Sequence, residues 1–233
     1  MRSTQSPFPC HWWGTGLEIA GLGEARPDIA TYGRYEFERL PRLPFELRGD
    51  FSWLLSFPVQ THHIGKQKAA ENARALSDLR AFAAKSGLDL PQPFTKFMAT
   101  ISLQERVRSN TDCFLDLCPQ PIPLSDDGGH VVRFLADSQA CVFWYLYVTP
   151  DASDHAVVST PAFYGTVSEQ WQDRPPENSE IVFSAESFET FMCRFWLENE
   201  IWFAAYENKP LTAAGRAYIE SYRGSGVQDD HSA

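Results

Sequence analysis

The stretch of sequence that decides the fold lies at residues 184–206 and reads SAESFETFMCRFWLENEIWFAAY. Phe188, Phe191 and Phe195 recur at intervals of three and four residues, the spacing of one face of an α-helix. Bulky rings on one face must be covered by other parts of the chain. The stretch therefore predicts a long helix that fills the main core of a globular domain.

The start of this helix and the width of its apolar surface lead to further expectations. Ser184 is the expected N-cap, with Glu186 near the positive end of the helix dipole. Trp196, Leu197 and Ile201 widen the apolar surface beyond a single stripe. Either a second element of the chain covers these three side chains, or they form an interface, for example between two copies of the chain.

The polar segment Glu198-Asn199-Glu200 interrupts the apolar surface and is flanked by Trp196 and Trp202. Tryptophan is frequent at the centre of protein interfaces, and carboxylates recognise arginine or lysine side chains of a partner. Trp196, Glu198, Glu200 and Trp202 are therefore the candidate partner-binding residues. The alternative is that the two carboxylates belong to the solvated polar face of a core helix.

The middle of the chain predicts a sheet. Apolar runs at short intervals predict strands at residues 112–117, 131–136, 141–148 and 155–159, which favours an antiparallel meander. Both faces of the 141–148 strand are apolar, so we expect a central strand that is covered on both sides. Nearer the N-terminus, residues 51–57 are the best strand candidate between Tyr32 and Val59.

Further helices are expected at residues 66–86, 94–100 and 212–222, where apolar side chains follow helical spacing. Gly87 is placed to end the first of these in a left-handed conformation. Helices at both ends of a run of strands are typical of an α+β fold. We expect a mostly antiparallel, curved sheet packed by helices in a single domain.

The domain organisation follows from the distribution of proline and glycine. Residues 1–30 are expected to form an irregular N-terminal arm that lies against the body or is partly disordered, and residues 31–223 to form the α+β domain. A turn at 126–129 and a polar loop at 169–178 interrupt that domain. Residues 224–233 are polar and are expected to form a disordered tail.

The composition limits the classes of partner. The chain has 233 residues, 20 basic and 30 acidic side chains and a formal net charge of −10. A hydrophobic content of 43% allows a sizeable core. Nucleic acids and anionic lipids need clustered lysine and arginine, so neither is expected as a partner. A basic protein would be attracted to the chain.

The sequence predicts a cytoplasmic protein. No apolar run approaches the length that crosses a bilayer, and prolines and glycines interrupt the first residues where a signal peptide would lie. The five cysteines are odd in number and scattered, so we expect reduced thiols: Cys10, Cys113, Cys118, Cys141 and Cys193.

No metal site and no cofactor are expected. His62 and His63 are adjacent rather than one helical turn apart, which fits a loop better than a zinc site. Cys113 and Cys118 would not meet along a strand, and unpaired cysteines are usually core residues.

Catalysis is not expected either. Asp154-His155 together with Ser138 or Ser159 contains the residue types of a hydrolase, but the sequence has no Gly-x-Ser-x-Gly turn to present a nucleophile. The glycines between residues 14 and 23 lack the Lys-Ser/Thr of a phosphate-binding loop.

The chain resembles the SUKH superfamily, also called the SMI1/KNR4 family, over residues 88–223. The similarity is carried by Leu90-Pro91 before the 94–98 helix, VRFLAD at 132–137, WYLY at 144–147, SFETF at 187–191, Leu211-Thr212 and Ala217-Tyr218. The resemblance implies an α+β domain without catalytic activity. Many bacterial members are immunity proteins that bind and neutralise toxins, often nucleases, and others are general protein-interaction modules.

The leading hypothesis is a non-enzymatic immunity protein that neutralises a basic, nuclease-type toxin, because a basic toxin and a chain of net charge −10 are complementary. The first alternative is a regulatory or self-associating interaction domain, possible as a homodimer through Trp196, Leu197 and Ile201. The second is an unrecognised enzyme or small-molecule-binding protein with a pocket near Trp144 and Trp202.

Overall fold

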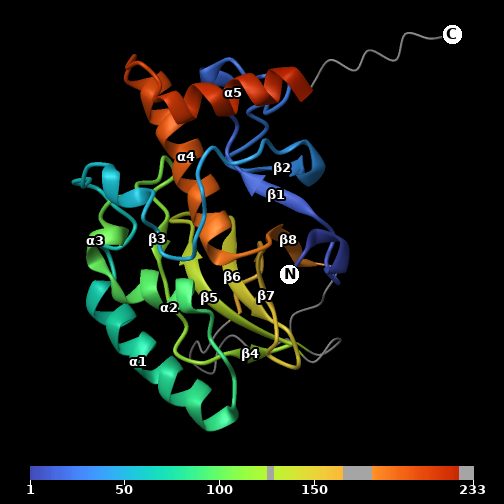
Figure 1. The fold of residues 1–233 in the computed structure, drawn as a ribbon, viewed down its shortest axis with the longest axis vertical. Helices are drawn as coiled ribbons and strands as arrows, with labels where there is room; N and C mark the ends of the chain where they lie inside the picture. Colours follow the sequence, from blue (N-terminus) through green and yellow to red (C-terminus); the bar gives the residue numbers. More distant parts are fainter. Residues whose placement is uncertain (125–128, 165–179, 226–233) are drawn as a thin grey trace, which may run out of the picture.

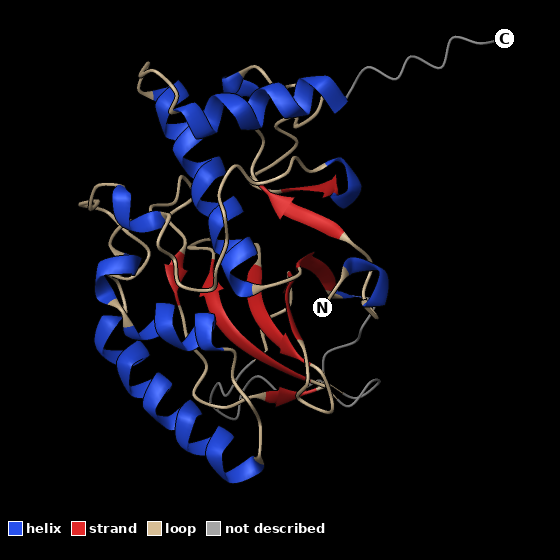
Figure 2. Cartoon of the chain, viewed as in Figure 1, coloured by secondary structure: helices blue, strands red, loops and turns tan. Residues whose placement is uncertain are grey.

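The structure is a computed structural model that describes residues 1–124, 129–164 and 180–225. Across these residues the chain has five α-helices and eight strands, and every pair of adjacent strands is antiparallel. The expected α+β class with an antiparallel sheet is confirmed (Figure 1, Figure 2).

A six-stranded sheet forms the centre of the molecule, with strand order β3-β5-β6-β7-β8 and β4 beside β5. The strands are β3 (Phe114–Leu115), β4 (Ile122–Pro123), β5 (His130–Ala136), β6 (Phe143–Val148), β7 (His155–Thr160) and β8 (Val182–Ala185). β5, β6 and β7 form the predicted meander. The strand predicted at 112–117 shortens to β3, because pairing with β5 is limited to two residues there.

Strand β6 lies in the middle of this sheet, and all six of its residues are buried. Trp144 and Leu146 belong to the main core, which the helices cover. Tyr145 and Tyr147 belong to a second apolar cluster that also contains Phe8. The predicted burial of this strand on both faces is confirmed.

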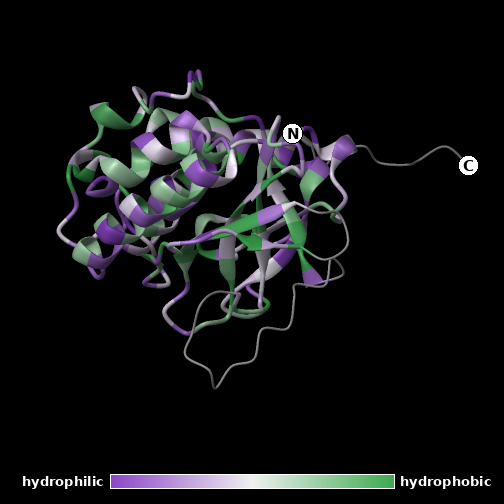
Figure 3. Ribbon diagram, turned by 90° about the horizontal axis from the view of Figure 1, so that it is seen from below, coloured by the Kyte–Doolittle hydropathy of each residue, from purple (hydrophilic) through white to green (hydrophobic). Residues whose placement is uncertain are grey.

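Three helices cover one side of the sheet: α1 (Ala69–Ser86), α2 (Gln92–Ala99) and α3 (Ile101–Gln104). Leu76 and Leu79 of α1 are buried, while charged side chains occupy its outer face, so hydrophilic and hydrophobic residues alternate along the helices in Figure 3. Gly87 has a φ of 70° and ends α1 as predicted.

Helix α4 (Phe188–Tyr206) begins later than predicted. Its N-cap is Ser187, whose Oγ accepts a hydrogen bond from the backbone N–H of Thr190 at 3.1 Å. The expected cap, Ser184, instead lies in β8, and its hydroxyl is hydrogen-bonded to that of Ser159 in β7 at 2.8 Å. The edge of β7 offers backbone pairing to residues 182–185, which the local sequence pattern does not reveal.

Most of α4 is buried on all sides. The rings of Phe45, Trp53 and Phe57 pack on Trp196, with centroid distances of 5.8, 5.4 and 4.2 Å. A second part of the chain therefore covers the wide apolar surface of the helix, which is the first of the two possibilities that the sequence left open.

The prediction of a strand at residues 51–57 is wrong, because this segment forms a turn and the 3-10 helix η4 (Leu54–Ser56). The carboxylate of Glu189 in α4 accepts hydrogen bonds from the backbone N–H groups of Gly49 and Phe51 and from Trp53 Nε1. These bonds replace the ladder partners of a strand and hold the segment in a bend.

The N-terminal arm is ordered on the body. Residues 1–30 contain η1 (Ser3–Gln5), β1 (His11–Gly14) and η2 (Glu18–Ala20). β1 pairs with β2 (Gly33–Glu36), which is followed by η3 (Phe37–Arg39) and lies just after the arm. Cys10 forms a parallel bridge with Phe183 of β8, so the arm extends the edge of the sheet. Residues 1–30 therefore lie against the body, which is the first of the two possibilities stated for them.

Helix α5 (Ala213–Ser225) follows α4 and crosses the arm near β1 and β2 (Figure 1). The hydroxyl of Thr212 accepts a hydrogen bond from Gly215 N at 3.0 Å, as expected of the residue that begins this helix. The loop predicted at 169–178 and residues 226–233 of the predicted tail lie outside the described residues, as does most of the turn at 126–129.

Truncation of Phe188 to alanine should destabilise the protein by about 3–5 kcal/mol, because its ring is fully buried and leaves a cavity. The ring contacts those of Phe51, Phe94 and Phe134, with centroid distances of 6.2, 5.1 and 5.0 Å. Urea unfolding measures the change. Phe82→Ala is the matched control, since Phe82 is 36% exposed and should cost much less.

Candidate functional site

The predicted partner-binding residue Glu198 lies in the interior and binds an arginine of the same chain. Its two carboxylate oxygens accept hydrogen bonds from Arg26 Nη1 at 2.6 Å and Nη2 at 2.9 Å. Trp12 Nε1 and the hydroxyl of Tyr218 donate two more, at 2.8 and 2.7 Å. Arg26 is 0% and Glu198 3% exposed, so this bidentate ion pair is fully enclosed.

The surroundings of Arg26 complete the network. Its guanidinium lies 4.0 Å from the ring centroid of Tyr35 and donates to the hydroxyl of Tyr222 at 3.0 Å and to the Thr15 carbonyl at 2.6 Å. Gly14 makes room for it, because a Cβ there would lie 3.0 Å from Arg26 Nη2 and 2.5 Å from Trp12 Nε1. The arm, α4 and α5 therefore meet at one buried charge pair.

Burial opposes the ionisation of Glu198, but the Arg26 guanidinium and its hydrogen bonds outweigh burial and hold the pKa of this carboxyl below its usual value. Arg26 also remains charged, because Glu198 raises its pKa against the effect of burial. Both partners are therefore ionised at neutral pH, and each compensates the other's loss of hydration.

The two neighbours of Glu198 bind a different segment. Asn199 Oδ1 accepts the backbone N–H of Asn110 at 2.7 Å. Glu200 forms a bidentate ion pair with Arg108, at 2.8 and 2.9 Å. The Glu198-Asn199-Glu200 segment thus holds the arm on one side of α4 and residues 108–110 on the other.

The structure separates the four predicted partner-binding residues. Trp196 is 1% exposed, and Glu198 lies in the ion pair with Arg26, so neither reaches the surface. Glu200 is paired with Arg108, and Glu200 and Trp202 are both partly exposed. Leu197 and Ile201 are also buried, so the dimer surface proposed from the sequence, which used Trp196 with these two residues, is covered by the chain itself.

Sequence reasoning missed Arg26, Trp12 and Tyr218. The expectation that the carboxylates would bind arginine was correct in its chemistry, but the arginines belong to the same chain. Arg26 lies in a segment rich in glycine and proline, and no spacing rule connects residues that are 172 positions apart. Acidic residues lie two positions from Arg26 on both sides, Glu24 and Asp28, so the local sequence gives no signal that this arginine is buried.

An exposed aromatic group remains where α4 ends. The rings of Trp202 and Tyr206 stack with a centroid distance of 4.9 Å and an angle of 13° between their planes. Phe203 packs edge-on against Trp202 and lies under the Arg108 guanidinium at 3.9 Å. Tyr206 is 64% exposed, whereas Trp202 and Phe203 are partly buried and Trp202 also packs against the main core. Trp202, Phe203 and Tyr206 are called here the aromatic end of α4.

The small-molecule pocket expected near Trp144 and Trp202 is not formed. Trp12, Tyr32, Trp144 and Phe195 are among the side chains that line a cavity of only about 10 Å³, which is room for about one water molecule. Trp202 does not line it. The core at this position is filled.

A wider depression of about 450 Å³ brings together His62, His63, Asp112 and Cys113. Burial raises the pKa of Cys113 to about 11, which keeps the group a thiol, and burial lowers the pKa of His63. Within residues 1–124, 129–164 and 180–225, histidine, cysteine and acidic side chains form no group of three or more that could hold a metal ion. All five cysteines are free, as expected.

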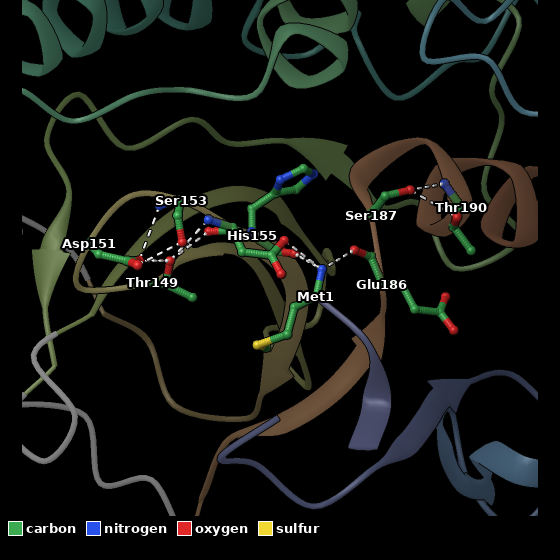
Figure 4. A network of polar contacts seen from close by, with 9 residues as sticks. Met1, Thr149, Asp151, Ser153, His155, Glu186, Ser187 and Thr190 are labelled. Carbon is green, nitrogen blue, oxygen red and sulfur yellow. Dashed lines mark hydrogen bonds and ion pairs between the residues drawn. The ribbon is translucent and has the colours of Figure 1, made fainter. Parts of the chain in front are cut away.

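Asp154 and His155 form a different kind of contact from the one considered for a hydrolase. The α-amino group of Met1 donates to Asp154 Oδ1 and the His155 carbonyl, both at 2.7 Å, and to the Glu186 carbonyl at 3.1 Å (Figure 4). The Ser138 hydroxyl donates to the Thr111 carbonyl at 3.1 Å, and that of Ser159 bonds to Ser184. These residues fasten the arm and the loops.

Comparison with protein-family models, with curated proteins and with solved structures found no match. The similarity to the SUKH superfamily therefore stays a prediction that rests on the residues quoted above. Among the described residues, the helices are too short or too polar to cross a membrane.

Arg26→Gln should destabilise the protein by about 3–5 kcal/mol, because it leaves the Glu198 carboxylate buried without its cation. Chemical denaturation measures the loss. Arg48→Gln is the control, since its ion pair with Glu46 has side chains 64% and 74% exposed and should contribute little because solvent screens it. Equal effects of the two substitutions would contradict the central role of the buried pair.

The same ion pair predicts a pH dependence. The pKa of Glu198 is lower in the folded chain than in the unfolded chain, so the unfolded state takes up its proton first as the pH falls. The stability from this group is complete above the ordinary glutamate pKa of about 4.3 and is lost as the pH falls toward the lower pKa of the folded state. Glu198→Gln should flatten the fall in urea midpoint below that pH, whereas Glu46→Gln should not.

Proposed function

We propose that this chain is a non-enzymatic protein-binding domain whose docking surface is the aromatic end of α4, and that its partner is a basic protein of the toxin class. The observation that carries the proposal is the stacked Trp202–Tyr206 pair, with Tyr206 64% exposed. Large rigid rings supply contact area at small entropic cost, and tryptophan and tyrosine dominate interface energies.

The net charge supports a basic partner. Around the aromatic end itself the charges are balanced, because Glu207 pairs with Arg108 at 3.2 Å and with Lys209 at 2.6 Å. Attraction therefore comes from the long-range field of a chain with net charge −10, and the aromatic rings supply the contact. Association should be fast at low ionic strength and slower as salt is added.

The resemblance to the SUKH superfamily suggests the class of the partner, a nuclease-type toxin that must be basic to hold its own substrate. Five free thiols favour a reducing compartment, so the cytoplasm is part of the proposal. A regulatory domain that binds a second copy of itself through the same rings is the alternative, and sedimentation distinguishes it by the mass of the purified chain.

The test is co-expression with proteins encoded beside its gene, followed by titration calorimetry of any pair that restores growth. Tyr206→Ala should weaken binding by about tenfold or more, the loss expected of a hot-spot residue, while the unfolding midpoint changes little. Phe82→Ala, an exposed aromatic side chain on α1, is the matched control and should leave the affinity unchanged. If Tyr206→Ala leaves the affinity unchanged, the proposed docking surface is wrong. If no protein encoded beside the gene binds the chain, the proposed function is wrong.

A further inference from the structure

A cleft lies between residues 21–39 and α5. One part has a volume of about 670 Å³ and is lined by Arg39 and Arg223 together with the turn at residues 21–25. A second part of about 180 Å³ is lined by Arg34 and Arg39. The two parts share Ala25, Arg39 and Tyr222, so they form one continuous cleft.

Three arginines from separate elements converge on this cleft: Arg34 from β2, Arg39 from η3 and Arg223 from α5. Arg34 stacks on Trp13 at 4.6 Å, and Arg223 reaches the Gly21 carbonyl at 3.5 Å. Two carboxylates, Glu24 and Glu36, also line the cleft, and Glu36 lies 3.8 Å from Arg39. A surplus of one positive charge remains, in a chain whose net charge is −10.

The floor of the cleft is held in place by the buried network. Tyr35 and Tyr222 line the cleft, and the Arg26 guanidinium lies 4.0 and 5.9 Å from the centroids of the same two rings. Gly21 has a φ of 77°, and a Cβ there would come within 3.1 Å of Arg223 Nη2. The backbone segments that carry Arg39 and Arg223 are therefore held by elements that the Arg26–Glu198 pair fixes, while both side chains are exposed and accessible to a ligand.

We infer that this cleft binds a small organic anion through a phosphate or carboxylate group held between Arg39 and Arg223. Guanidinium groups donate paired hydrogen bonds to both kinds of oxyanion. The volume of the wider part suits a small metabolite, and Leu22, Ala25 and Pro27 offer apolar contact to its carbon skeleton. A bound anion would connect the arm to α5 and stabilise their contact with α4.

The test titrates the full chain at low ionic strength with inorganic phosphate and, separately, with citrate, and follows backbone amide shifts by nuclear magnetic resonance. Saturable shifts that include Gly21, Gly23 and Ala25 are expected for at least one anion, and the responding anion identifies the phosphate or the carboxylate source. Absence of saturable shifts with both anions overturns the inference.

Two double variants that each remove two positive charges distinguish anion binding in the cleft from a general effect of net charge. Arg39→Gln/Arg223→Gln should weaken binding by about tenfold or more, whereas Arg42→Gln/Arg216→Gln, which changes two arginines that do not line the cleft, should leave it nearly unchanged. Glu24→Gln should strengthen binding, because it removes a carboxylate from the site. Equal weakening by both double variants would overturn the inference, and thermal unfolding verifies that each variant is folded.

Discussion

Arg26 and Glu198 meet in the interior at 2.6 and 2.9 Å, and the rest of the structure is arranged around this contact. An isolated charge is costly to bury, so neither residue could occupy its position without the other. The remaining hydrogen bonds come from the arm, through Trp12 and Thr15, and from α5, through Tyr218 and Tyr222. Three segments far apart in sequence are thereby fixed relative to one another.

Other polar side chains along helix α4 also bind segments that are distant in the sequence. Glu189 binds the backbone of the bend near residue 51, Arg194 binds the Pro41 carbonyl and Tyr218, and Glu200 binds Arg108. These polar side chains attach α4 to the bend, to loop segments and to helix α5, and they are themselves hydrogen-bonded, as buried polar groups require. The helix is therefore apolar on all sides for packing and polar at selected positions for attachment.

Because the chain itself binds most side chains of α4, the surfaces proposed to bind a partner or a ligand lie at the two ends of this buried network of contacts. Side chains in the middle of α4 are bound by the chain itself, while Tyr206 at its end is exposed and stacks on the partly buried Trp202. At the other side, the rings around Arg26 form the floor of the cleft that carries Arg39 and Arg223. Protein binding and anion binding are thus proposed for separate surfaces connected by one buried core.

Local pattern predicted much of the fold. Helical spacing placed α1 and α4, the apolar run at 141–148 predicted the central strand, and Gly87 ended its helix as expected, because each depends on side chains close in sequence. The predictions of an N-cap at Ser184 and of a strand at residues 51–57 were wrong. Ser184 lies in a strand that pairs with the distant β7, and the Glu189 carboxylate binds backbone N–H groups of the 51–57 segment.

The aromatic rings of residues 184–206 by themselves determined that this protein would have a buried helix at its centre, because apolar area on that scale must leave water. What the polar residues of the same helix would bind was decided only by the tertiary structure. A carboxylate can be matched by any arginine, and whether that arginine comes from a partner or from position 26 depends on the path of the chain. That path brought Arg26 to Glu198 and left Tyr206 to the solvent.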